Sequence, residues 1–234
     1  NLAAETCRVL GHTRRNRMVF HAVLGISWFW FFGATLTAQL PLYTRAWLGG
    51  DASVLNLVLT LFSVGVGVGS LLCEKLSARR VEPGLVPLGA AGMTVFAVDL
   101  YFAQSHAAAV HDINWLQFLH GAGNWHIALD LTLIGLVSGL YIVPLFALVQ
   151  SRTDPAHLSR VIAGTNILNA AFMVAAAALG IGVLRLGYSV PQLFLLVALL
   201  NAAMAAWIFI RVPEFPRRFV AWARRRPTDP SSPL

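Results

Sequence analysis

Charged residues are scarce in this sequence. Asp, Glu, Lys and Arg make up 12% of the 234 residues, hydrophobic residues make up 57%, and the mean hydropathy is +0.69. A soluble domain carries about a quarter charged residues. A large soluble all-α protein with buried helices is the alternative, but its helices would need polar faces, which the long apolar stretches of this chain lack. The composition therefore indicates a membrane protein.

Cysteine is rare too, and several patterns of catalytic chemistry are missing. Cys7 and Cys73 are the only cysteines, so no disulfide framework can be read from their spacing. The sequence contains no Gly-x-x-x-x-Gly-Lys-Ser/Thr phosphate loop, which excludes a nucleotide-driven pump of that type within this chain. No nucleophile stands at a persuasive spacing from a general base. We therefore predict that the chain is not an enzyme and uses no cofactor.

Six long apolar stretches account for most of the chain. A hydrocarbon core of about 30 Å takes roughly 20 residues of helix to cross. The backbone must satisfy its own hydrogen bonds in lipid, so each stretch is expected to be helical. We predict an all-α membrane fold with six transmembrane helices, divided into two units of three. The predicted spans are 19–44, 52–73, 84–102, 127–150, 161–184 and 186–210.

The positive charges lie on one set of the gaps between these stretches. All but two of the 17 Lys and Arg residues precede the first span, follow the sixth, or lie between spans two and three or four and five; the exceptions are Arg45 and Arg185. The positive-inside rule therefore places both termini in the cytoplasm. Because the charge follows the topology and forms no single patch, we predict no nucleic-acid partner. The predicted divisions are a cytoplasmic connector at 1–17, a six-helix bundle at 18–211, and an interfacial segment with a disordered tail at 212–234.

Two segments outside the spans are expected at the membrane surfaces. Residues 103–126 contain four histidines, which suggest a metal site, but their spacing matches no zinc pattern, so we predict an interfacial loop and no metal. After the sixth span, Phe215, Phe219 and Trp222 lie at i, i+4 and i+7 among arginines. This pattern is typical of a short helix on an anionic leaflet, although an ordinary positive-inside stop is the alternative.

Polar and aromatic residues within the spans are candidates for the substrate pathway, because each polar group costs free energy in lipid. Asp130 could relay protons or meet a cationic group, or it could cap the helix in whose first turn it lies. Asp99, near the outer end of its span, is a further functional candidate. For the neutral residues, hydrogen bonding between helices is the alternative, and for the tryptophans, contact with lipid. The candidate pathway residues are Asp130, Asn56, Asn166, Asn169, Tyr141, Gln39, Trp28 and Trp30. Separately, Gly65 and Gly69 form a GxxxG step, which predicts close packing with another helix.

The segment 70–80 resembles the loop signature of the major facilitator superfamily. Serines replace two glycines of that signature, and Glu74 replaces its Asp. A degenerate copy after the second span fits the second half of such a transporter. The resemblance implies an inner gate, for which ordinary positive-inside charge is the alternative. The candidate gating residues are Glu74, Lys75, Arg79 and Arg80.

A closer resemblance covers most of the chain. The segments 25–33, 48–51, 62–74, 141–144 and 160–169 resemble the bacterial lysophospholipid transporter family, most of all the version fused to 2-acylglycerophosphoethanolamine acyltransferase. The resemblance implies the C-terminal six helices of a multi-pass transporter of the bacterial inner membrane, which moves lysophosphatidylethanolamine-like lipids for reacylation.

That resemblance also implies partners. They are a lipid or amphiphilic substrate, a missing N-terminal half of six helices, and a fused or associated acyltransferase. The start at Asn1, in an Arg-rich stretch, likewise leads us to expect a piece of a longer polypeptide. A facilitator-type exporter of small solutes or drugs, and a non-transporting scaffold for an acyltransferase, are the alternatives.

Overall fold

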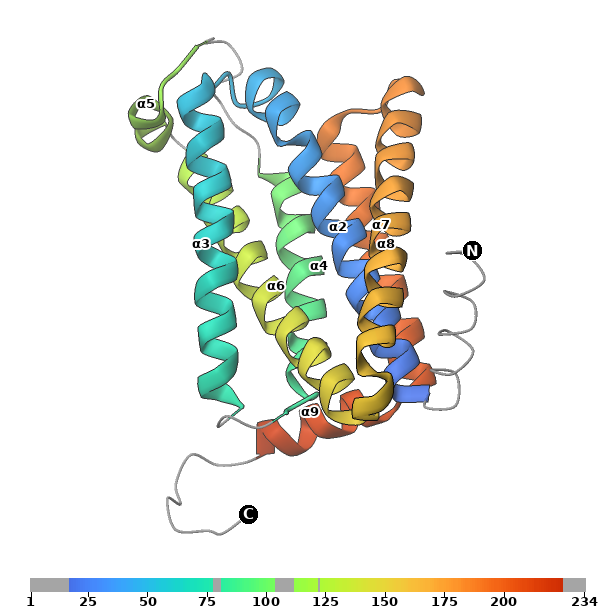
Figure 1. The fold of residues 1–234 in the computed structure, drawn as a ribbon. Coiled ribbons are helices and arrows are strands. Elements are labelled where there is room, and N and C mark those ends of the chain that lie inside the picture. Colours follow the sequence, from blue (N-terminus) through green and yellow to red (C-terminus); the bar gives the residue numbers. More distant parts are fainter. Residues whose placement is uncertain (1–16, 78–80, 104–111, 122, 225–234) are drawn as a thin grey trace.

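A computed structural model describes residues 17–77, 81–103, 112–121 and 123–224 of the protein (Figure 1). These residues form helices and, among them, no β-strand, although one isolated bridge joins Gly50 to Ile113. The helices are α2 (Arg17–Ala46), α3 (Ala52–Leu76), α4 (Leu85–Phe102), α5 (Trp115–His120), α6 (Asn124–Arg152), α7 (Pro155–Arg185), α8 (Val190–Arg211) and α9 (Glu214–Arg224). The predicted connector at 1–17 lies outside the described residues, apart from Arg17.

Six of these helices, α2, α3, α4, α6, α7 and α8, are long and apolar enough to cross a membrane. The predicted all-α fold with six spans is therefore confirmed. The six run between one end of the bundle that carries α5 and another that carries α9 (Figure 1). We call these the α5 end and the α9 end. The charge pattern predicts that the α9 end is cytoplasmic.

Helix caps explain where α7 and α8 begin at residues other than those predicted. α7 begins six residues early because the Asp154 carboxylate accepts a hydrogen bond from the backbone N–H two residues on, at 2.9 Å. α8 begins four residues late, since Gly187 adopts φ +87° and Ser189 and Gln192 form a capping box. α6 begins three residues early, which places His126 in its first turn instead of in a loop.

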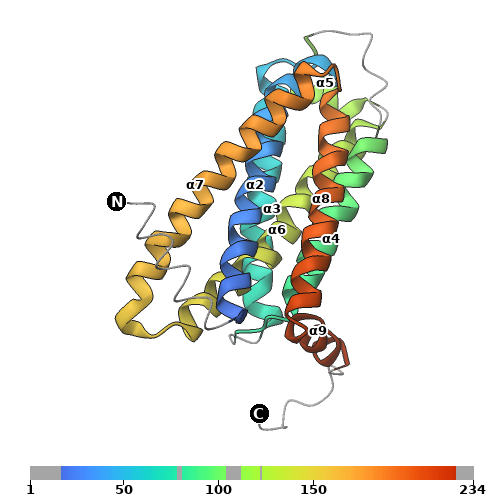
Figure 2. The ribbon, with the colours of Figure 1, turned by 90° about the vertical axis from the view of Figure 1, so that its right-hand side faces the viewer.

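The packing of the spans follows a simple exchange rule. α3 packs along α6 and α2 along α7; α4 lies against α6 and α8, and α2 also contacts α6 and α8. Exchanging α2 with α6, α3 with α7 and α4 with α8 turns the pair α3–α6 into α2–α7 and the pair α4–α6 into α2–α8, and it leaves α4–α8 and α2–α6 as they are. This is the pattern that two inverted three-helix units would produce. Figure 2 shows α7 beside α2 and leaning outward toward the α9 end.

Glycines allow α3 and α6 to approach closely. A Cβ atom added to Gly65 or Gly69 would collide with backbone atoms of α6, and one added to Gly135 or Gly139 would collide with backbone atoms of α3. Gly67, on the same helix as Gly69, has nothing within 4 Å of an added Cβ. The predicted close packing at the GxxxG step is therefore confirmed, and glycines of α6 complete it.

The segment around α5 is attached to the start of α3. Asp51 caps α3: its Oδ1 accepts hydrogen bonds from the Ser53 hydroxyl at 2.6 Å and the Ser53 N–H at 2.7 Å. The bond from the Ser53 hydroxyl, more than any other contact, lowers the pKa of the Asp51 carboxyl. The Asp51 N–H donates to the Ile113 carbonyl at 3.0 Å, and the Trp115 N–H donates to the Ser53 hydroxyl at 3.0 Å. Within the predicted interfacial loop, residues 112–121 are therefore held against the bundle.

Helix α9 lies across the end of the bundle that is opposite to α5 (Figure 1). Phe215 is fully buried, and Trp222 Nε1 donates a hydrogen bond to the Leu76 carbonyl at 3.1 Å. Glu214 pairs with Arg152 at 3.4 Å. The helix thus connects the ends of α3, α6 and α8, and its contact with an anionic leaflet stays a prediction.

The two glycines of α3 provide a matched test of this packing. We expect Gly69→Ala to lower the free energy of unfolding by about 1–3 kcal/mol, because its Cβ has no room against α6. Gly67→Ala should leave stability unchanged or raise it slightly, since alanine favours the helix. Thermal unfolding in detergent measures both, and equal melting temperatures for the two variants would contradict the packing described above.

Candidate functional site

An apolar groove of about 780 Å³ lies between α2, α3, α6 and α7. Its volume falls in the range of about 300–1,000 Å³ that is typical of sites for small molecules. Neutral polar side chains interrupt the apolar wall at Thr37, Ser63 and Gln150. The groove is lined by Phe29, Trp30, Gly33, Ala34, Thr37, Phe62, Ser63, Val66, Ile142, Val143, Phe146, Ala147, Gln150 and Met173. The arrangement offers a slot for an acyl chain.

Of the predicted pathway residues that the structure describes, only Trp30 lines the groove. Asn169 on α7 forms a hydrogen bond with the Trp30 side chain. Asn169 is buried on α7 and lies 2.8 Å from the Ser27 hydroxyl. With its amide nitrogen toward Ser27, Asn169 also donates to the Thr165 carbonyl at 3.1 Å and accepts from Trp30 Nε1 at 3.2 Å. This orientation satisfies every donor and acceptor of the amide. The cluster joins α7 to α2 and orients the Trp30 ring at the groove wall.

Trp28 and Tyr141 lie in the helix interfaces, away from the groove. Trp28 Nε1 donates to Asn201 Oδ1 at 2.8 Å, and Asn201 Nδ2 in turn donates to the Ala90 carbonyl at 3.0 Å. Asn201 therefore joins α2, α4 and α8. The Tyr141 hydroxyl donates to the Gly25 carbonyl at 3.3 Å, and the residue is only 2% exposed. For both residues the placement fits hydrogen bonding between helices.

The other neutral candidates lie outside the groove lining. Asn56 and Asn166 are exposed, although Asn166 stands only three residues from the buried Asn169. Gln39 is half-buried, with its amide nitrogen 3.2 Å from a Cβ added at Gly180 on α7. A role in the pathway stays a prediction for all three.

The predicted gating residues are only partly described. Glu74 and Lys75 are exposed near the C-terminal end of α3, at the α9 end of the bundle. Arg79 and Arg80 lie outside the described residues. The gate itself therefore stays a prediction.

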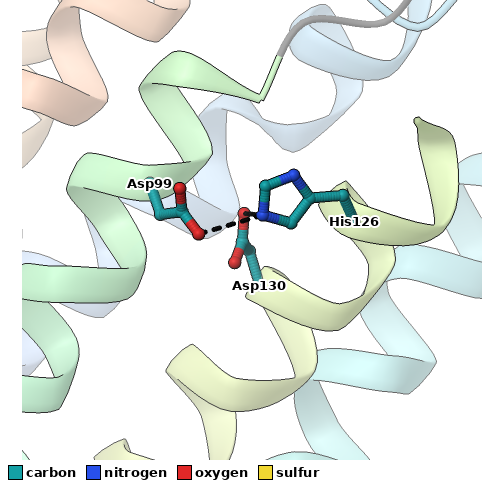
Figure 3. Close-up of side chains that lie close together, drawn as sticks. All are labelled: Asp99, His126 and Asp130. Carbon is teal, nitrogen blue, oxygen red and sulfur yellow. Dashed lines mark hydrogen bonds and ion pairs between the residues drawn. The ribbon is translucent and has the colours of Figure 1, made fainter.

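Asp130 and Asp99 come together with a histidine at the α5 end (Figure 3). His126 Nε2 lies 3.0 Å from Asp99 Oδ2 and 3.8 Å from Asp130 Oδ2. The sequence predicts a loop at His126, whereas the structure has this residue in the first turn of α6. Its spacing of four residues from Asp130 is the signal that could have paired the two, because residues at i and i+4 share a helix face.

A second pocket, of about 480 Å³, opens at the α5 end between α2, α4 and α8. Its lining includes Tyr43, Trp47 and Tyr101, and aromatic residues of this kind are common where a membrane meets water. It contains none of the predicted pathway residues.

Three curated bacterial proteins named lysophospholipid transporter LplT are similar to this chain. The protein from Enterobacter sp. (strain 638) is 30% identical over 149 residues, 63% of this chain and 32% of the relative. The one from Photorhabdus laumondii is 26% identical over 148 residues, with the same coverage. The one from Citrobacter koseri is 29% identical over 206 residues, 84% of this chain and 46% of the relative.

These similarities confirm the predicted resemblance to lysophospholipid transporters, whereas the resemblance to the version fused to an acyltransferase stays a prediction. The chain spans between about a third and a half of the length of the curated relatives that it matches. No family model matches the chain, and no solved structure matches it.

Asn169 and Asn166 allow a matched test of the polar cluster. We expect Asn169→Ala to destabilise the bundle by about 0.6–1.7 kcal/mol for each interhelical hydrogen bond lost. Asn166→Ala should change stability little, because the side chain of Asn166 is exposed. Unfolding in detergent measures the stability. The Trp30 ring should also become more mobile in Asn169→Ala, which ¹⁹F NMR of fluorotryptophan detects. Identical spectra and stabilities for the two variants would show that Asn169 does not hold Trp30.

Proposed function

We propose that this chain forms one half of a secondary transporter that moves lysophospholipid across the bacterial inner membrane. The observation that carries this proposal is the similarity to three proteins named lysophospholipid transporter, each matched over 63–84% of this chain. The six apolar helices and these relatives make the chain a multi-pass membrane protein. Because the relatives are transporters, we further propose that the chain moves its substrate without chemical change.

The groove supports this proposal through its shape and its chemistry. A lysophospholipid has one acyl chain and a polar head group, so it needs an apolar slot next to groups that form hydrogen bonds. The walls of α2, α3 and α6 supply large apolar side chains, and Gln150 extends the lining toward the α9 end. None of the side chains that line the groove carries a charge. Such a wall suits an acyl chain and a head group with little net charge.

The groove is an open slot, so transport needs a second wall. Four of the six spans contribute to the lining, and the chain covers less than half of the length of its relatives. We propose that a preceding unit of six helices covers this face and that the two units rock about the substrate, as in other transporters built from repeated units.

The destination of the lipid follows from the resemblance alone. We propose that the lysophospholipid reaches the inner leaflet, where a fused or associated acyltransferase restores its second chain. The α9 end, with exposed Arg217 and Arg224, would then face the cytoplasm. Epitope tags at each terminus that label from the cytoplasmic side only would agree with this orientation.

Gly33 provides a test of the groove that leaves the fold intact. It lines the groove and has nothing within 4 Å of an added Cβ, so a larger side chain fits there without strain but occupies the slot. We expect Gly33→Leu, in the full-length protein in proteoliposomes, to slow the flipping of labelled lysophosphatidylethanolamine about tenfold. Displacing two methylene groups of the acyl chain costs about 1.6 kcal/mol, which corresponds to a factor of that size.

Gly67→Leu is the matched control, because Gly67 also has open space but lies outside the groove lining. Equal transport by the two variants would contradict a role for the groove. Transport of a drug or a sugar in place of the lysolipid would instead favour a facilitator-type exporter. Normal lipid turnover in cells with either variant, together with no flipping by the wild-type protein, would favour a scaffold for an acyltransferase.

A further inference from the structure

Three side chains with metal-binding atoms converge at the α5 end of the bundle (Figure 3). Asp99 comes from the last turn of α4, and His126 and Asp130 come from the first two turns of α6. One ligand atom from each residue lies within 4.8 Å of the others. We propose that Asp99, His126 and Asp130 form a binding site for a divalent transition-metal ion of the zinc type.

The buried carboxylate of Asp130 points to a missing ligand. The residue is 1% exposed, and among the described residues its Oδ2 atom has no hydrogen-bond partner. The nearby imidazole does not satisfy it, because His126 Nε2 carries at most one proton and lies closer to Asp99, at 3.0 Å against 3.8 Å. A buried oxygen of this kind is costly unless a donor or a cation meets it.

The charges of the cluster also favour a cation. When both carboxylates are ionised they carry two negative charges, and a single imidazole could balance at most one of them. A divalent ion would balance both while the imidazole stays neutral and binds through its lone pair. Neighbouring helices bring no Lys or Arg to these three residues in any described ion pair.

The mixture of donors selects the class of metal. Imidazole nitrogen suits zinc and its neighbours, whereas Mg²⁺ and Ca²⁺ prefer oxygen ligands alone. Bonds of about 2.0–2.2 Å in a tetrahedral site place neighbouring ligand atoms about 3.3 Å apart. The two separations from His126 Nε2, 3.0 and 3.8 Å, lie on either side of that value. Three protein ligands leave the fourth position to water.

The site is open to ions from outside the bundle. The side chains of Asp99 and His126 are 45% and 40% exposed, while that of Asp130 is 2% exposed. The two exposed ligands lie near helix ends, where the predicted topology meets the aqueous phase. A bound ion would join α4 to α6 at this end. The prediction of no metal site considered the histidines of one segment and left out the carboxylates within the spans. The proposed site combines one of these histidines with two such carboxylates.

Zinc titration of the purified chain in detergent tests the proposal, and it needs no transport. We expect calorimetry with ZnCl₂ to show one tight site per chain and zinc to raise the melting temperature. His126→Ala and Asp130→Asn should each weaken zinc binding by more than about tenfold, which is the loss typical of disturbing even an outer partner of a metal ligand. Both variants should also lose the rise in melting temperature.

His120→Ala is the control, because this histidine is exposed, lies at the same end of the bundle and is not part of the cluster. It should bind zinc like the wild type. If Asp130→Asn does not fold, Asp99→Asn replaces it, since that residue is partly exposed. The visible spectrum of added Co²⁺ should show a nitrogen and oxygen site that His126→Ala removes. No zinc binding by the wild type, or equal losses in His126→Ala and His120→Ala, would overturn the proposal.

Discussion

The absence of water from the bilayer interior is the constraint on which the rest of this structure depends. A peptide group in hydrocarbon finds no solvent to hydrogen bond with, so the six apolar stretches become helices. The same constraint acts on side chains. Asn201 and Asn169, both buried in the spans, meet donors and acceptors of neighbouring helices. Buried polar side chains of the spans, including Asn169 among the predicted pathway residues, therefore hold helices together.

Two kinds of contact divide the bundle into parts with different packing. α3 and α6 approach so closely that their backbones touch through glycines, whereas α2 and α7 are joined through the cluster around Asn169. The groove lies between these two pairs, and its apolar wall contains Trp30, whose ring that cluster orients. A polar interaction thus shapes an apolar surface. This coupling would let a change at the α2–α7 contact alter the shape of the slot.

The fold could be predicted from the sequence because membrane spans depend on composition over about 20 residues, which a single substitution hardly alters. The GxxxG step was equally readable, since small residues four apart make one flat helix face. The site was not. Trp28 and Trp30 look alike in the sequence, yet one contacts Asn201 and the other lines the groove, because two residues of helix turn a side chain by more than half a circle. The cluster around His126 was missed because α6 begins at Asn124, three residues before the predicted span, and the hydropathy does not show this extension toward the α5 end.

We propose that the face formed by α2, α3, α6 and α7 holds the acyl chain of a lysophospholipid. Photo-crosslinking of the full-length protein in membranes, with a lysophosphatidylethanolamine that carries a photoreactive group at the end of its chain, tests this most directly. We expect labelling at Val143 and Phe146 that excess unlabelled lysolipid suppresses, while labelling at the exposed Val95 of α4 is not suppressed. Suppression that is equal at Val95 and Phe146, or no label on α6, would contradict the proposal.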